Sequence, residues 1–313
     1  MRFAATIGGE AVGVQAAPGD LVAQAVQAEA DGFGSAWTVH FSRVVDALSV
    51  LAAAGVRTAT IDLGVGVVPS YPRHPLALAQ QAATVQALCS GRLTLGVGVS
   101  HRPVIEGLHG LAYTDPVGHM REYLSVLVPL LRRGEVTFSG RYFRVDGGFT
   151  VPGTSPVPVL VGALGPRMVE AAGELADGVV TWLAGPRSLE AVVVPRLAAA
   201  SGGRPPPRVV AAIPVAVCAD VDAARAAAES VFARYGQLEN YQRLMAREAV
   251  SSVGDLAVIG DEDAVSRQLG RFADVGVTEL WAVPFPVQAD PDGAARTRRL
   301  LTALALDLAP EAH

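Results

Sequence analysis

Cysteines and long apolar segments are both scarce in this sequence of 313 residues. The two cysteines, Cys89 and Cys218, are far apart and lie in apolar surroundings, which excludes a disulfide framework and predicts buried thiols. The apolar run Val209–Ala219 is about half of the ~20 residues that a membrane crossing needs, and Pro214 interrupts it. The N-terminal run Phe3–Ile7 is too short for a signal peptide. We therefore expect a cytoplasmic protein that does not span a membrane.

Charge is also sparse, because charged residues make up 18% of the chain and the net charge is −5. The basic residues are scattered, so the sequence lacks the electrostatic footprint of a nucleic-acid-binding protein. His109 and His119 have no nearby carboxylate–histidine pair with metal-ligand spacing, and no Gly-x-Ser-x-Gly motif supports hydrolase chemistry. We expect no metal, no nucleic acid and no membrane among its partners, but a small-molecule substrate.

Apolar runs of strand length alternate with helical patterns along the whole chain. Near-continuous apolar strands separated by crossover helices predict a parallel sheet, and eight such units close into a (β/α)8 TIM barrel, an α/β fold. Barrels of this size form one domain, so we expect a single domain over residues 1–313. The expected strands are Phe3–Ile7, Ser35–Val39, Ile61–Val68, Leu93–Val99, Pro158–Gly162, Gly178–Leu183, Val209–Val217 and Glu279–Val283.

Helix punctuation agrees with this order of elements. Asp20 is expected to cap the first helix, Pro75 to open the third, and Asp261 to precede the last of the helices between strands. The predicted helical segments are Asp20–Asp31, Val45–Ala54, Pro75–Leu88, His119–Leu131, Arg167–Ala176, Ser188–Ala199, an alanine-rich stretch Asp222–Glu248, and Asp261–Asp274.

Three segments exceed ordinary loops and are expected to be insertions in the barrel. One, Ser100–Gly118, follows strand 4, and the alanine-rich stretch Asp222–Glu248 lies between strands 7 and 8. The third, Arg132–Pro158, contains two alternating runs around Ser139-Gly140, a pattern that predicts a β-hairpin.

Catalytic residues of such barrels lie just past the C-terminal ends of the strands. His40 follows the second strand, and Ser100 and His101 follow the fourth. Because a free histidine titrates near neutral pH, His40 and His101 are the candidates for proton transfer or for polarising a carbonyl group. A structural hydrogen bond is the alternative role for each of them.

Glycines suggest where a flat ligand could lie. The sequence Leu-Gly-Val-Gly-Val occurs at 63–67 and again at 95–99, on neighbouring strands, where glycine allows a ligand or another chain segment to come close. Simple small-residue packing in the barrel is the alternative. After the fifth strand, the turn Gly162, Ala163, Leu164, Gly165, Pro166 and Arg167 enters a helix whose free N–H groups could bind phosphate, although an ordinary tight turn explains it equally well.

These segments together resemble a known family. Gly64-Val65-Gly66-Val67-Val68-Pro69, Arg73-His74-Pro75 with the helix after it, and Ser90-Gly91-Arg92-Leu93-Thr94-Leu95-Gly96-Val97-Gly98 are similar to the luciferase-like monooxygenase superfamily. Ser100–Gly107, His119–Leu124 and Leu164–Met168 resemble the branch that uses the deazaflavin coenzyme F420. The resemblance covers nearly the whole chain.

The resemblance implies a set of functional residues. The cofactor ring is expected against a bulge at Gly66, Val67 and Val68 with a cis peptide at Gly66–Val67, and the cofactor is further expected to contact Ser100 and His101, with its phosphate at Gly162–Arg167. His40 falls where F420-dependent sugar-phosphate dehydrogenases carry a catalytic histidine, but His101 stands where they have an acidic residue, which argues against sugar-phosphate oxidation. Trp37, Trp182 and Phe285 suggest an apolar substrate pocket, with core packing as the alternative.

The predicted function is hydride transfer between coenzyme F420 and an activated C=C, C=N or C=O bond, in a homodimer. Two alternatives stay open: an oxygen-activating monooxygenase of the same fold that uses flavin mononucleotide (FMN), and a cofactor-binding barrel without catalytic activity.

Overall fold

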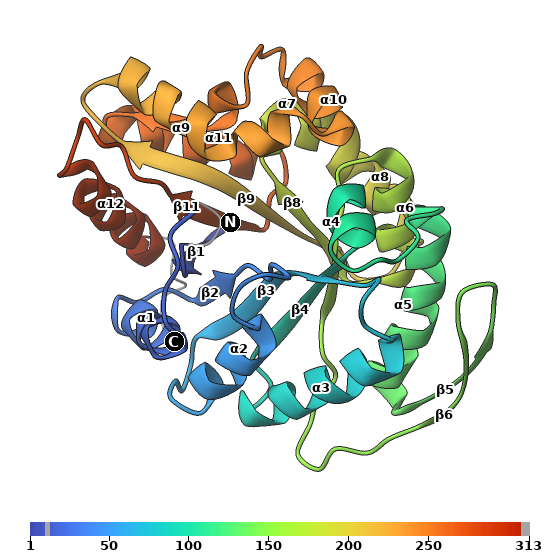
Figure 1. Ribbon diagram of the computed structural model, residues 1–313. Helices are drawn as coiled ribbons and strands as arrows, with labels where there is room; N and C mark the ends of the chain where they lie inside the picture. The colour runs from blue at the N-terminus through green and yellow to red at the C-terminus, as the bar shows by residue number, and fades with distance from the viewer. Residues whose placement is uncertain (10–12, 308–313) are drawn as a thin grey trace.

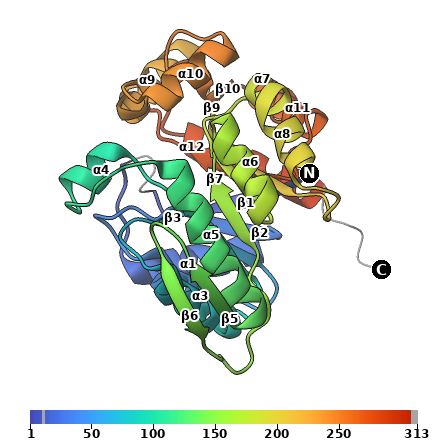
Figure 2. The same ribbon diagram turned by 90° about the vertical axis from the view of Figure 1, so that its right-hand side faces the viewer.

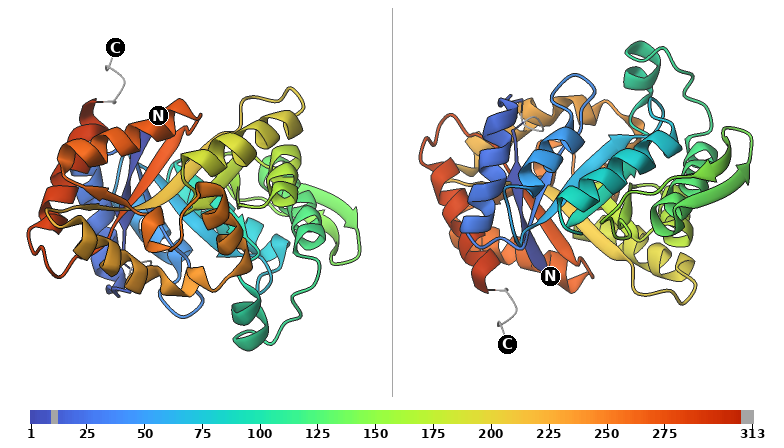
Figure 3. Two further views of the ribbon diagram at one scale, coloured as in Figure 1. Left: turned by 90° about the horizontal axis from the view of Figure 1, so that it is seen from above. Right: turned by 90° about the horizontal axis from the view of Figure 1, so that it is seen from below.

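The computed structural model describes residues 1–9 and 13–307. Within them, eight parallel strands form a closed ring in the order β1, β2, β3, β4, β7, β8, β9, β11, with β11 pairing back to β1. Helices surround this ring, which is seen from its two sides in Figure 3. The strands are β1 (Arg2–Ile7), β2 (Ser35–Thr38), β3 (Asp62–Pro69), β4 (Leu93–Gly98), β7 (Val159–Gly162), β8 (Gly178–Trp182), β9 (Arg208–Val217) and β11 (Glu279–Pro284). The predicted TIM barrel is confirmed, with each strand in its expected segment.

The helices between the strands also lie where their patterns predict them. They are α1 (Pro18–Ala30), α2 (Ala47–Gly55), α3 (Pro75–Leu88), α5 (Pro116–Arg133), α6 (Pro166–Leu175), α7 (Pro186–Ser188) continued through a π-helical turn (Leu189–Val193) into α8 (Val194–Ala200), and α11 (Glu262–Asp274). A helix that the sequence analysis did not assign, α12 (Gly293–Asp307), follows the last strand. Its Thr297 hydroxyl accepts a hydrogen bond from the Val217 amide at 2.8 Å, which ties α12 to the end of β9.

Two of the three predicted helix N-termini are confirmed by the structure. Asp261 accepts a hydrogen bond from the Ala264 amide at 2.8 Å and caps α11 as expected, and Pro75 opens α3 after His74, whose Nδ1 accepts from the Leu76 amide. The expected cap at Asp20 is wrong. Pro18 occupies the first helical position of α1, so the helix begins before Asp20, which lies in the first turn.

The three insertions lie at different places around the barrel. The segment after β4 contains α4 (Arg102–Gly107), and the predicted hairpin is confirmed as β5 (Glu135–Ser139) paired antiparallel with β6 (Arg144–Gly148). The alanine-rich stretch forms two helices, α9 (Val221–Gly236) and α10 (Glu239–Glu248), followed by η3 (Gly254–Leu256) and β10 (Val258–Gly260), which adds to β9. In Figures 1 and 2, α9 and α10 lie at one end of the molecule and the hairpin at the other. Within the described residues, no helix combines the length and apolarity that a bilayer crossing requires.

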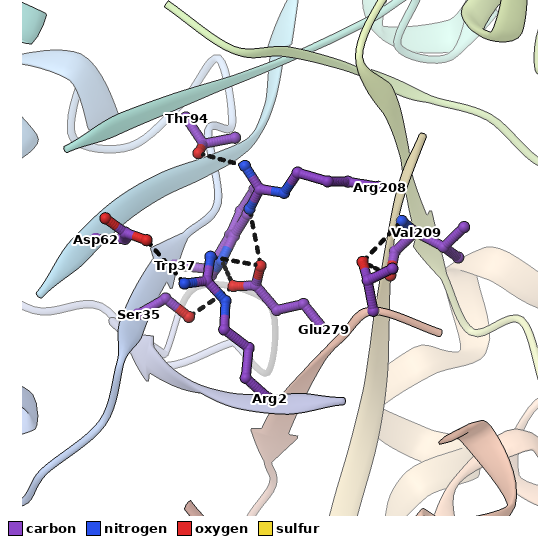
Figure 4. A network of polar contacts seen from close by, with 9 residues as sticks. Arg2, Ser35, Trp37, Asp62, Thr94, Arg208, Val209 and Glu279 are labelled. Carbon is purple, nitrogen blue, oxygen red and sulfur yellow. Dashed lines mark hydrogen bonds and ion pairs between the residues drawn. The ribbon is translucent and has the colours of Figure 1, made fainter. Parts of the chain in front are cut away.

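The apolar core has two parts. The larger lies between the strands and the surrounding helices, and the smaller fills the inside of the barrel. The inner part consists of Ala4, Trp37, Leu160, Val180, Val210, Ala212, Trp281 and Val283. At the N-terminal ends of the strands this inner core meets a polar network centred on the buried carboxylate of Glu279, drawn in Figure 4. The opposite, C-terminal ends form the mouth of the barrel.

Candidate active site

Three partly exposed apolar side chains form the floor of the mouth. Val39 follows β2, Val67 belongs to β3 and Trp182 ends β8, and all three pack on the buried core inside the barrel. Val39 and Trp182 continue the alternation of inward-facing side chains along their strands, whereas Val67 faces inward because the register of β3 shifts between Val65 and Val68. The floor is therefore apolar and open to a ligand above it.

A bulge in β3 raises one part of this floor. The pairing of β3 with β4 shifts register between Val65 and Val68, and the Gly66–Val67 peptide is cis, as the resemblance implied. In the second half of β3, Gly66 and Val67 keep partial exposure while the residues on both sides of them are buried. The bulge thus presents one short stretch of strand to the mouth.

The glycines around the bulge make room for the protein's own side chains. A Cβ atom at Gly98 would lie 2.6 Å from the Val67 side chain, and one at Gly162 would lie 3.2 Å from it. Similarly, a Cβ at Gly64 would lie 2.3 Å from the Trp37 ring. The hypothesis of a flat molecule lying directly on these glycines is thereby modified, because Val67 and Trp37 occupy the space and the open surface is the bulge itself.

His40 lies beside the floor, where several groups fix its protonation state. Its Nδ1 accepts a hydrogen bond from the Ala47 amide at 3.4 Å and lies 3.9 Å from a carboxylate oxygen of Asp46. Asp46 is paired with Arg73 at 2.5 Å. Burial and the Arg73 charge lower the pKa of His40 to about 4, against the opposing effect of Asp46. His40 is therefore neutral at pH 7 and, with Nδ1 as acceptor, carries its proton on Nε2.

His101 lies on another side of the mouth, at the start of α4. Its ring is 6.4 Å from the Tyr235 ring and 6.1 Å from the Tyr241 ring, both on the insertion helices. Burial, with a smaller contribution from Arg234, lowers its pKa. The preceding Ser100 has a positive φ of 59°, and its carbonyl oxygen accepts a hydrogen bond from the Tyr113 hydroxyl at 3.2 Å.

The proposed phosphate segment follows β7 as expected. Gly162 and Leu164 are partly exposed, Ala163 is buried, Gly165 is the N-cap residue of α6 and Pro166 its first residue. A Cβ at Gly165 would meet only open space, so the helix N-terminus is accessible, and Arg167 is exposed next to it. Arg247 of α10 reaches over this segment and donates a hydrogen bond to the Leu164 carbonyl at 3.3 Å. Basic side chains thus flank an accessible helix N-terminus, an arrangement that favours an anion.

The three predicted pocket residues have different surroundings. Trp182 is partly exposed, and its ring lies 6.0 Å from Tyr235 and 5.8 Å from Phe232. Phe285 is 4% exposed and packs edge-on against Phe232. Trp37 is 1% exposed and lies inside the barrel below the floor, so contact with a substrate would require the floor to open.

The insertion helices α9 and α10 supply site residues that the sequence analysis did not single out. Tyr235 and Tyr241 face His101, while the Arg234 guanidinium lies over the Phe41 ring in the loop after β2, 5.1 Å from its centroid. Tyr235 in α9 and Tyr241 in α10 have the ordinary spacing of buried helix faces, and Arg234 is an exposed arginine, so no local signal distinguishes them. Their role depends on where the insertion folds back.

Comparisons with known proteins agree with this fold. The sequence model of the family described as luciferase-like monooxygenase matches residues 1–279. A 5,10-methylenetetrahydromethanopterin reductase of Archaeoglobus fulgidus is 32% identical over 291 residues, which cover 82% of this chain and 86% of the relative. An F420-dependent glucose-6-phosphate dehydrogenase of Nakamurella multipartita is 33% identical over 180 residues, 53% of each protein. Among solved structures, the coenzyme F420 dependent tetrahydromethanopterin reductase of Methanopyrus kandleri shares the fold with a TM-score of 0.77 at 22% identity, over 97% of both chains.

Proposed function

Because this chain belongs to the luciferase-like monooxygenase family, we propose that it is an oxidoreductase that depends on coenzyme F420. The reaction would transfer a hydride between the deazaflavin and a small organic substrate with an activated C=C, C=N or C=O bond. Relatives named for F420-dependent chemistry support this choice of coenzyme over FMN.

The observation that carries the proposal is the partial exposure of Gly66 and Val67 in the bulge of β3. The bulge, Val68 behind it and the apolar floor of Val39 and Trp182 suit a flat, largely apolar ring. When bound, the deazaflavin supplies the hydride donor or acceptor. The chain's own residues then have three tasks: to hold the ring, to anchor its phosphorylated tail, and to orient the substrate.

The tail of the coenzyme fits the accessible N-terminus of α6. We assign the segment from Gly162 to Arg167 to phosphate binding, with Arg247 adding a second positive charge from α10. Ser100 and His101 complete the proposed cofactor contacts across the mouth.

The two histidines are proposed to act as neutral hydrogen-bond donors. At pH 7 the imidazole of His40 is uncharged, with its proton on Nε2, so it can polarise a carbonyl or imine without first being protonated. His101 has a lowered pKa for the same main reason, burial. Trp182 and Phe285, with Tyr235, would form the apolar side of the substrate pocket, and Trp37 would support it from below.

Titration with coenzyme F420 and with FMN tests the proposal most directly. We expect coenzyme F420 to bind more tightly, and reduced F420 to be oxidised by an electron-poor acceptor without oxygen consumption. Oxygen uptake with FMN in the presence of substrate would instead support the monooxygenase alternative. Tight binding without turnover across a broad panel of acceptors would support a non-catalytic role.

Substitution of the two histidines tests their assignment. His40→Asn and His101→Asn, made separately, should each lower kcat by about tenfold to a hundredfold. Kd for F420 should stay nearly unchanged in His40→Asn, and it should rise in His101→Asn only as far as His101 also contacts the cofactor. His109→Asn is the matched control, because His109, in the insertion after β4, hydrogen-bonds Ser42 of the loop after β2 and has no proposed part in the reaction. Unchanged kcat in both site variants would remove the two histidines from the mechanism.

The oligomeric state and the cellular location of the protein are also proposals. A homodimer through helices on one flank is what the family resemblance implies, and the cytoplasmic location expected from the sequence stays a prediction.

A further inference from the structure

The polar network at the N-terminal end of the barrel is centred on one fully buried carboxylate, Glu279, which is 1% exposed. One of its oxygens, Oε1, accepts hydrogen bonds from the Ser35 hydroxyl at 2.6 Å and from the Trp37 indole N–H at 2.7 Å. The other, Oε2, accepts from Arg2 at 3.0 Å and from Arg208 at 2.8 Å. Figure 4 shows these donors converging on the carboxylate.

This carboxylate is a charged, fixed acceptor. Burial alone would raise the pKa of Glu279, but the charges of Arg2 and Arg208 and the hydrogen bonds from Ser35 and Trp37 outweigh it and lower the pKa below its ordinary value. Glu279 is therefore ionised at neutral pH. A hydrogen bond to an ionised acceptor is shorter and stronger than a neutral one, so it restrains the indole of Trp37 effectively.

Trp37 extends the network towards the mouth. Its ring stacks on the ring of Trp281, with centroids 5.6 Å apart and planes inclined by 30°. Trp281 is fixed in turn by its indole N–H, which donates to the Thr6 hydroxyl at 2.9 Å. Both rings are at most 2% exposed. The stacked pair fills the inside of the barrel between the network and the floor of the site.

The two rings lie directly against the backbone of β3. A Cβ atom at Gly64 would be 2.3 Å from the Trp37 ring, and one at Gly66 would be 2.6 Å from the Trp281 ring. Gly66 begins the bulge whose exposed surface we assign to the cofactor. Interiors are close-packed, so a shift of either ring changes the space available to this backbone.

We propose that Glu279, acting through Trp37 and Trp281, is a positioning residue that sets the height of the β3 bulge and thereby the fit of the cofactor ring. The contacts described above carry the claim that the two tryptophans support the bulge. The claim that the group bound on the bulge is the cofactor ring rests on the proposed function. If the tryptophans only filled the core, their volume alone would matter. On our proposal the position of the bulge also depends on the hydrogen bond from Trp37 to Glu279.

The chain offers a matched pair of variants that separates these two roles. Trp37→Phe keeps an aromatic ring and removes the indole donor to Oε1. Ser35→Ala removes the other donor to the same oxygen, from the same strand, but Ser35 does not belong to the stacked pair. Because phenylalanine is smaller than tryptophan, a purely structural role predicts a larger loss of stability in Trp37→Phe, but exchange at the bulge that follows the global stability of each variant.

The first measurement uses cofactor-free protein. Amide hydrogen exchange in residues 64–68, compared with the exchange expected from the global stability of each variant, should be faster in Trp37→Phe than in Ser35→Ala. Near-ultraviolet circular dichroism of Ser35→Ala should match that of the wild type. Exchange at the bulge that follows global stability equally in the two variants would overturn the inference. Glu279→Gln is the corroborating variant, but it leaves two arginines without a buried counter-charge, so the decision rests on the pair.

The second measurement uses the fluorescence and absorption of coenzyme F420. Trp37→Phe and Trp281→Phe should raise Kd about three- to tenfold and shift the absorption of the bound coenzyme, whereas Ser35→Ala should bind it like the wild type. Wild-type Kd and spectrum in both tryptophan variants would also overturn the inference. Failure of the wild type to bind F420 would instead refute the proposed function, and the exchange experiment would still decide whether the network positions the bulge.

Discussion

At the scale of single residues, the charge state of His40 is set by burial and by two charged neighbours, of which Arg73 is distant in sequence. Burial lowers its pKa most, and Arg73, brought in by the loop before α3, lowers it further. Asp46 works in the opposite direction but is itself engaged by Arg73. A histidine in this setting suits hydrogen-bond donation better than delivery of a proton from an imidazolium.

Removing the Arg73 charge should therefore raise the pKa of His40. In Arg73→Gln the repulsion that opposes protonation is lost and Asp46 is released, and both changes favour the imidazolium. NMR titration of the His40 ring should show a pKa between about 4 and the ordinary 6.5. Arg43→Gln, at an exposed arginine close in sequence, should leave the titration unchanged. A pKa that stays near 4 in Arg73→Gln would contradict this account.

Arg92 illustrates what the family-like sequence Ser90-Gly91-Arg92 does in this fold. Ser90 and Gly91 have positive φ angles of 51° and 87°, which turn the chain sharply after α3. The guanidinium of Arg92 then donates to the carbonyl oxygens of Gly55, Thr58 and Ile61. These family-like residues therefore have a structural role. Arg92 ties the loop between α2 and β3 to the start of β4, at the end of the barrel away from the mouth.

At the scale of elements, the insertion helices α9 and α10 complete the site. The sequence predicts helix over Asp222–Glu248, which is confirmed except for the break between Gly236 and Glu239. Periodicity could not show that Tyr235 and Tyr241 meet His101, because that contact joins segments more than a hundred residues apart. Folding of the insertion over the mouth decides it.

Stability of α9 should depend on its cap. Asp220 accepts a hydrogen bond from the Ala223 amide at 2.9 Å, so Asp220→Ala should destabilise the helix by about 1 kcal/mol. Amide hydrogen exchange in Val221–Gly236 should accelerate accordingly. Asp222→Ala removes an exposed ion pair with Arg225 and an exposed first-turn carboxylate but no capping hydrogen bond, so it should have a smaller effect. Equal acceleration in both variants would show that the cap is not what holds α9.

At the scale of the whole molecule, buried histidines make stability depend on pH. Burial is the main cause that lowers the pKa of His40 and His119 to about 4, against 6.5 in an unfolded chain. Between these values the unfolded chain binds more protons than the folded one, so the free energy of unfolding falls as pH falls through the window from about 6.5 to 4. Above pH 6.5 this contribution to stability is complete.

His119→Phe tests this dependence. The His119 ring stacks on Tyr71 with centroids 3.9 Å apart, so phenylalanine keeps the packing and removes the titrating group. Denaturant unfolding at a series of pH values should show a flatter loss of stability in the variant between about pH 6.5 and 4. A slope equal to that of the wild type would assign the acid sensitivity to other groups.

The predicted single domain over residues 1–313 stays a prediction, and its residues 10–12 and 308–313 lie outside the described part. The hairpin β5–β6 and the helices α9 and α10 lie at opposite ends of the molecule (Figure 2), so α9 and α10, but not the hairpin, can contribute to the mouth.

The barrel could be predicted from the amino-acid sequence alone, because the alternating strand and helix signals are local and the near-continuous apolar residues of each strand indicate that both of its faces are buried. The sequence also placed His40, His101 and the turn Gly162–Arg167 at the mouth, since residues after parallel strands share one end. The structure was needed to show that Val67 and Trp37 fill the space beside the glycines. It was also needed to show that burial, with a further contribution from Arg73, keeps His40 uncharged, and that Glu279 reaches the bulge through two tryptophans. These facts depend on contacts between distant segments, and such contacts form only when the ring of strands closes.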